Sequence, residues 1–161
     1  MKKSKKNKKK LKRIKIKCKS VNNVVCNTKS KLLVYSSFIF ITNALTAYYK
    51  GYYLYSCLFI LLTATSIIFH LYGGLLLIII DKIPILCIVA YGGNMLYQKL
   101  FNMHIFKIIF IVTTFLLTIF LYYYGYFTNT FCYHPDKCIR DRYHCLVHCI
   151  GSIGHHLIIL L

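Results

Sequence analysis

The sequence predicts an all-α, multi-pass transmembrane helical bundle of about five helices, preceded by a disordered basic N-terminal tail. Three observations lead to this fold class. Hydrophobic residues make up 58% of the 161-residue chain, against roughly 45–50% in soluble domains. Apolar runs of about 20 residues recur, which is the length that a helix needs to cross a bilayer. The third observation is charge, because 14 of the 21 Lys and Arg residues lie in residues 1–31.

This distribution divides the chain into a basic tail, residues 1–31, and a transmembrane helical domain, residues 32–161. Positively charged segments beside membrane helices stay in the cytoplasm, so the tail is expected there. Its basic residues are expected to contact anionic lipid, at about 1 kcal/mol each near the surface. Nucleic acid is disfavoured as a partner, because the tail has no aromatic side chain to stack on bases. The simplest alternative is a solvated tail that only sets orientation.

The first two predicted helices are closed by turns that contain glycine. The first helix covers residues 32–49 and ends before Lys50–Gly51. The second covers residues 52–72 and ends at Gly73–Gly74, a dipeptide typical of a tight turn. A short turn of this kind makes the next helix antiparallel to the second.

Three further helices are expected after this turn. The third, residues 75–98, contains Pro84 near its start, where proline is best tolerated. The fourth, residues 104–127, ends in a tyrosine cluster suited to the membrane interface. A polar loop then leads to the fifth, residues 143–161.

Orientation follows from the basic residues that flank these helices. Five crossings place the turn after the second helix and the loop before the fifth on the same side as the tail. That loop contains Lys137, Arg140 and Arg142, as expected for a cytoplasmic loop. The sequence therefore predicts an integral membrane protein with a cytoplasmic N-terminus.

Five polar side chains are spaced so that the helices bring them to one membrane depth. Ser66 and His70 are four residues apart and share a face of the second helix, as do His144 and His148 on the fifth. Asp81 follows His70 by eleven residues, across the double-glycine turn. At 1.5 Å per residue, the five groups fall within about 10 Å of one depth. Ionisable groups in apolar helices generally mark functional sites.

The residue types in this group indicate a zinc site. Three imidazoles, from His70, His144 and His148, can hold Zn²⁺ and leave one position open for water, whose pKa falls to about 7 on zinc. Asp81 is the candidate general base and proton relay. Ser66 is placed to hydrogen-bond the water or an oxyanion.

Each of these residues also has a structural interpretation. Histidines in an apolar helix often form interhelical hydrogen bonds, and an isolated Ser66 can bond to the backbone. Asp81 can pair with a basic residue. His155, seven residues after His148, is a candidate spare ligand or a support for one. His155 and His156 are more simply interpreted as helix-packing residues.

A competing metal site is also conceivable from Cys132, Cys138 and a neighbouring histidine, either His144 or His148. The C-x5-C spacing fits poorly with the steps of two to four residues that are usual in zinc sites. The three-histidine site is therefore the favoured one.

The order Ser-x-x-x-His, then Asp, then a late His-x-x-x-His resembles the superfamily that contains the alkaline ceramidases, the progestin and adiponectin receptors and haemolysin III-like proteins. The segment "SIIFHLYGGLLLIIIDKIPIL" is most similar to the ceramidase branch, and "HCLVHCIGSIG" resembles that family's final helix. The resemblance covers roughly residues 35–98 and 143–161. It implies zinc held by His70, His144 and His148, with Asp81 and Ser66 contacting the zinc-bound water. The implied reaction is hydrolysis of the amide bond of ceramide or a related lipid.

Two other functions remain open at this point. The family typically has seven helices and an acidic calcium-binding segment, whereas this chain has about five predicted helices and no acidic residue before the first. A non-catalytic, zinc-stabilised receptor-like or scaffolding protein is the alternative. A basic-tailed membrane anchor that recruits anionic lipid or nucleic acid is the third.

Overall fold

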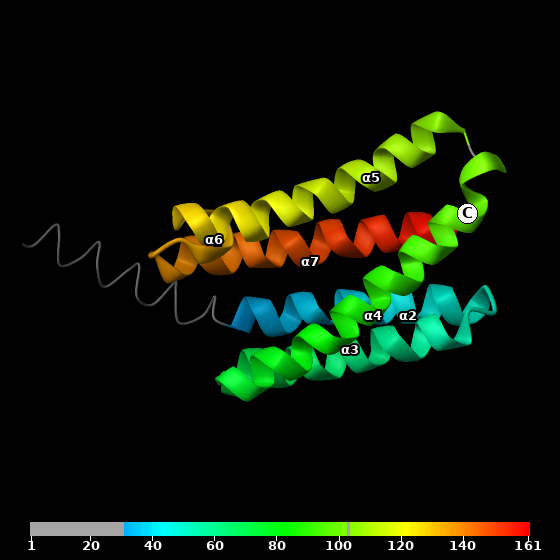
Figure 1. Ribbon diagram of the computed structural model, residues 1–161. Coiled ribbons are helices and arrows are strands. Elements are labelled where there is room, and N and C mark those ends of the chain that lie inside the picture. Colours follow the sequence, from blue (N-terminus) through cyan, green and yellow to red (C-terminus); the bar gives the residue numbers. More distant parts are fainter. Residues whose placement is uncertain (1–30, 103) are drawn as a thin grey trace, which may run out of the picture.

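The computed structural model describes residues 31–102 and 104–161, and in this part of the chain the protein is all-α with five long helical segments (Figure 1). The predicted fold class is thus confirmed for these residues. The prediction of a disordered basic tail falls almost wholly on residues 1–30, which lie outside the described residues.

The helices follow one another through short connections. Residues 31–37 are helical and lead, after a turn at Phe38, into α2. The elements after this turn are α2 (Ile39–Tyr49), α3 (Tyr53–Tyr72), α4 (Leu75–Lys99), α5 (Ile105–Ile119), the π-helical segment η2 (Phe120–Tyr124), α6 (Gly125–Thr128), the short 3-10 segment η3 (Phe131–Tyr133) and α7 (Lys137–Ile159). The first four predicted helices agree with the structure to within one residue at each end.

The fifth helix begins at Lys137 instead of residue 143, so this predicted boundary was wrong. The cause is Asp136, whose Oδ1 accepts hydrogen bonds from the backbone N–H of Cys138 (2.8 Å) and Ile139 (3.4 Å). A carboxylate at this position satisfies the unpaired N–H groups of a first turn. The charged residues that follow therefore lie on the first turns of α7 and not in a loop.

Four helices are long and apolar enough to cross a membrane: Lys31–Tyr49, Tyr53–Tyr72, Leu75–Lys99 and Ile105–Thr128. α7 is not among them, since its first turns are charged and four histidines follow on it. Five crossings were predicted, and the structure supports four. A crossing by α7 and a cytoplasmic N-terminus stay predictions.

α7 is the central helix of the bundle. It packs against α2, α4, α5 and η3, while α2 packs against α3 and α3 against α4 (Figure 1). The core is apolar and includes Phe40, Phe59, Ile88 and Ile158, which are almost completely buried. α4 and α5 are connected at one end of the bundle, and their ribbons diverge toward the other (Figure 1).

The outer surface is apolar as well. Large side chains such as Leu54 (60% exposed), Leu86 (68%) and Phe106 (79%) point away from the bundle. In water such a surface would aggregate, whereas a surface of this kind is matched by lipid tails. The interior holds the polar groups instead, as expected for helices that assemble in a membrane.

Two interhelical hydrogen-bonded groups lie in the middle of the bundle. Asn43 donates through Nδ2 to the carbonyl oxygen of Ser152 (2.9 Å) and to Nδ1 of His156 (2.6 Å), and Ser152 Oγ donates back to Asn43 Oδ1 (2.5 Å). The hydroxyl group of Tyr55 and Nδ1 of His155 are joined by a hydrogen bond (2.5 Å). His155 and His156 thus join α7 to α2 and α3, in agreement with the helix-packing interpretation.

Candidate metal centre

Three histidines come together at one end of the bundle. His70 lies in the last turn of α3, and His144 and His148 lie in the first half of α7. α3 ends there because Gly73 and Gly74 adopt φ of 67° and 108°, values that favour glycine. This turn reverses the chain, so the His70 ring stays at the end of the bundle where α7 begins.

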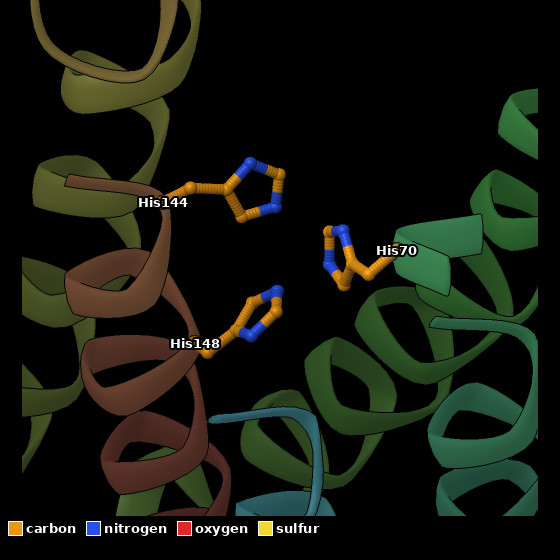
Figure 2. A group of neighbouring side chains, drawn as sticks. All are labelled: His70, His144 and His148. Atoms are coloured by element: carbon orange, nitrogen blue, oxygen red, sulfur yellow. The ribbon is translucent and has the colours of Figure 1, made fainter. Parts of the chain in front are cut away.

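The three side chains are close enough together that they could hold a metal ion. One ligand nitrogen from each of His70, His144 and His148 lies within 4.8 Å of the others. The ring centroids are 4.9–5.4 Å apart, and the rings point into a shared space between α3 and α7 (Figure 2). In a tetrahedral site with zinc–nitrogen bonds of about 2.1 Å, the ligand nitrogens lie about 3.4 Å apart. Binding of an ion would therefore draw the three rings closer together.

One atom of the group lacks a partner. Nε2 of His70 is buried and, among the described residues, has no hydrogen-bond partner. A buried polar atom left in this state costs roughly 1–3 kcal/mol, which a metal–nitrogen bond would offset. The donor set therefore fits a metal ion. His148 is buried, whereas His70 and His144 are half-buried, so the exposed edge of the site lies on these two rings.

Ser36 fixes the ring of His148. Its Oγ donates to the carbonyl oxygen of Leu33 (3.0 Å) and lies 2.9 Å from His148 Nδ1. A hydroxyl has one proton to donate, so Nδ1–H of His148 is the donor in the second contact. This tautomer leaves Nε2 of His148 as the metal-binding nitrogen.

The contact of Ser36 with His148 was not predicted from the sequence. Ser36 lies 112 residues before His148, and no spacing rule links positions so far apart. The available signal was a pair of hydroxyl residues, Ser36–Ser37, at the start of an otherwise apolar helix.

Ser66 lies one turn before His70, as predicted, and is buried. Its Oγ is 3.0 Å from Oγ of Ser37, which itself donates to the carbonyl oxygen of Leu33 (2.9 Å). Ser66 is therefore the donor to Ser37 and helps to hold α3 against the start of the first helix. Its catalytic role stays a prediction.

Asp81 is buried in the second turn of α4. It accepts a hydrogen bond from Thr65 Oγ1 on α3 at 3.4 Å. Among the described residues the group of metal-ligand atoms does not include its carboxylate. Asp81 is thus close to the end of the bundle that holds the histidines without being one of the ligands, and its role as a base stays a prediction.

Two more residues at this end were not identified from the sequence. Lys82 Nζ lies 4.5 Å from the ring centroid of Tyr122 in η2, and this ring is 6.3 Å from that of His144. Asp141, in the second turn of α7, pairs with Arg140 (3.8 Å), while its buried Oδ2 has no hydrogen-bond partner in the described part of the chain. The contact of Lys82 with Tyr122 depends on how the helices are rotated, which the sequence pattern does not give.

Burial changes the pKa of two side chains in η3, the short segment that precedes α7. Burial raises the pKa of the Cys132 thiol to about 11, and the charge of Lys82 opposes this rise. Burial also raises the pKa of Tyr133, whose ring packs 5.2 Å from that of Tyr122. The surroundings of η3 are thus poorly hydrated. Cys132 and Cys138 are not members of the metal-ligand group, so the competing cysteine site is not formed by these residues in the structure.

A hollow of about 330 Å³ lies between α5 and α7 and is lined by Phe106, Lys107, Phe110, Ile111, Leu157, Leu160 and Leu161. It lies at the opposite end of the bundle from the histidines. This hollow is therefore separate from the three-histidine group.

Comparisons of the chain with protein-family models, with curated proteins and with solved structures find no match. The fold and the site together therefore define the class of protein. Its described residues contain four helices long and apolar enough to span a membrane and a three-histidine group that could hold a metal ion.

Proposed function

We propose that the protein is an integral-membrane, zinc-dependent hydrolase that cleaves the amide bond of a membrane lipid. The observation that carries the proposal is the convergence of His70, His144 and His148, with Nε2 of His70 buried and unsatisfied. Three neutral imidazoles without a fourth protein ligand are the donor set of catalytic zinc sites, whereas structural zinc sites have four protein ligands.

When bound, zinc supplies a Lewis acid and lowers the pKa of a water molecule at the site to about 7. The chain's own residues supply orientation and proton transfer. Ser36 holds His148 in the tautomer that leaves Nε2 free. Asp81, held by Thr65, accepts the proton that water loses as its oxygen adds to the amide carbonyl carbon. The C–N bond then breaks, the proton passes to the amine, and the products are a carboxylic acid and an amine.

The substrate class rests on the motif resemblance and on the position of the site. Ser66, His70, Asp81 and the His144–His148 pair follow the order found in alkaline ceramidases, whose substrate is ceramide. The histidines lie near one end of helices that are apolar on their outer surface. An amide at the head-group end of a lipid chain would lie at a similar depth.

The test is zinc content and lipid hydrolysis in detergent-purified protein. We expect about one zinc per wild-type chain and release of fatty acid from an N-acyl lipid panel that includes ceramide. His148→Ala should lose zinc and activity, and Asp81→Asn should keep zinc and lose activity. His104→Ala is the matched control, since His104 is exposed at the start of α5. Unchanged hydrolysis in both site variants would falsify the proposal.

A non-catalytic role has one observation in its favour. The histidines come from α3 and α7, which are joined mainly through side chains and intervening helices. A metal ion there would act as a clamp between the two. Zinc binding that raises the unfolding temperature, without turnover of any lipid in the panel, would assign the protein to this class.

A further inference from the structure

Lys82 extends from α4 toward the chain segment that follows α5. It is half-buried, and its Nζ lies 4.5 Å from the ring centroid of Tyr122 in η2. This contact joins α4 to η2. The side chain of Lys82 is thus directed toward a neighbouring segment of the bundle. A lysine that anchors a helix at the membrane surface would instead extend its ammonium group toward water.

Tyr122 places this ammonium group beside the metal ligands. Its ring centroid is 6.3 Å from that of His144 and 4.5 Å from Lys82 Nζ. Lys82 Nζ therefore lies no farther from the His144 ring than the sum of these two distances. A head group and an adjacent amide of one lipid can span a separation of this size.

Lys82 forms no ion pair within the part of the chain that the structure describes. Among the described residues, the ion pair that forms at this end joins Arg140 and Asp141. Asp81, the chain neighbour of Lys82, hydrogen-bonds to Thr65 instead. A cation–π contact is worth about 0.5–2 kcal/mol and leaves the three N–H donors of an ammonium available. A cation in apolar surroundings usually has an anionic partner, and among the described residues no carboxylate lies within ion-pair distance of Lys82.

The distribution of charge favours the same end of the bundle. The helix that follows the basic tail begins there, as the contact of Ser36 with His148 shows. Lys137, Arg140 and Arg142 lie on the first turns of α7 at this end. Of the basic residues that the structure describes, Lys50, Lys99 and Lys107 lie toward the other end. Anionic lipids are therefore concentrated at the end that holds the histidines.

We propose that the lipid taken by this site carries a phosphate group next to its amide, and that Lys82 binds that phosphate while the amide faces the three histidines. The inference rests on the proposed function for the chemistry at the amide. It changes the substrate class, because ceramide itself is neutral at its head group.

The experiment compares ceramide 1-phosphate with ceramide of the same acyl chain, using zinc-loaded full-length protein in nanodiscs. Hydrolysis is one readout. The second is photo-crosslinking of diazirine-labelled forms of both lipids, which needs no turnover. The variants are Lys82→Gln, which removes the charge, and Lys82→Arg, which keeps it. Lys107→Gln is the control for a lost lysine at the other end.

We expect the wild type to crosslink and cleave the phosphorylated lipid at least about tenfold better than ceramide, the size expected for a charge-assisted hydrogen bond. Lys82→Gln should lose this preference, while Lys82→Arg and Lys107→Gln retain it. Equal preference in wild type and Lys82→Gln overturns the inference even if both lipids are hydrolysed. Lys82-dependent crosslinking without hydrolysis supports the phosphate site and overturns the hydrolase.

Discussion

Ser36 and His148, 112 residues apart in the chain, are joined by a 2.9 Å contact between Oγ and Nδ1. Ser36 donates its hydroxyl proton to the carbonyl oxygen of Leu33. His148 is therefore the donor in its hydrogen bond with Ser36. The contact therefore sets both the orientation of this ring and the nitrogen that it offers to a metal.

Replacing Ser36 with alanine is expected to weaken zinc binding by about 10–100-fold, the usual effect of removing a support of a metal-binding histidine. Titration with a competing chelator gives the affinity. Ser37→Ala is the matched control, because Ser37 contacts Ser66 and not a histidine. Equal affinities of the two variants would show that the contact does not position His148.

Zinc is expected to stabilise the folded protein, because the three-histidine group exists only in the fold. At a free zinc concentration 100 times Kd, the free energy of unfolding should rise by about 2.7 kcal/mol. Thermal unfolding in detergent, with and without a chelator, measures the difference. In His144→Ala the chelator should have no effect, and a persistent effect would place the metal elsewhere.

Gly92 provides a test of helix packing around Tyr55 and His155. A Cβ at this position would lie 2.5 Å from Tyr55 Oη and 3.3 Å from His155 Nδ1. Gly92→Ala should therefore lower the free energy of unfolding by about 1–3 kcal/mol through overpacking. Gly93→Ala is the control, since nothing lies within 4 Å of its Cβ. Similar stabilities in a denaturant titration would mean that α3, α4 and α7 are less closely packed there.

The start of α7 depends on Asp136. Asp136→Ala removes the acceptor for the N–H groups of Cys138 and Ile139 and should cost about 1 kcal/mol of stability. Asp136→Ser, which keeps an oxygen at the same position, should recover most of it. If serine is no better than alanine in the same denaturant titration, the cap does not stabilise the helix.

Cys132 is expected to react slowly with alkylating reagents. Burial raises the pKa of its thiol to about 11, and the thiolate is the reactive form. At pH 8 the thiolate fraction is thus on the order of 100-fold below that of an ordinary cysteine, and the rate should keep rising up to about pH 11. Mass spectrometry of alkylated protein follows this rate, with denatured protein as the reference. Since Lys82 lowers this pKa, Lys82→Gln should move the rise to higher pH, and an unchanged profile would argue against their proximity.

Much of the fold follows from short-range properties of the sequence. Helix lengths are set by the thickness of the bilayer, so apolar runs and glycine turns gave four helices to within one residue. The three histidines were found because the i, i+4 spacing and the antiparallel order of the helices fix their depth. The predicted start of α7 was wrong because charged residues between apolar runs usually indicate a loop, whereas here Asp136 caps a helix that contains them.

Two contacts at the site could not be predicted from residue spacing. Ser36 meets His148, and Lys82 meets Tyr122, only because of how each helix is rotated about its own axis and how the helices cross. Rotation and crossing depend on side-chain packing across the whole bundle. A one-dimensional pattern fixes depth in the membrane but not these angles.

The number of residues in the π-helical segment η2, Phe120–Tyr124, determines whether Tyr122 faces Lys82 and His144. One residue more or less in a helix turns everything beyond it by about 100°. Removal of a single residue from η2 would permit a regular α-helix and would carry Tyr122 away from Lys82 and His144. Such a deletion leaves all three histidines in the chain, so related sequences that differ only in the length of this segment would keep the three-histidine group and lose the contact between Lys82 and Tyr122.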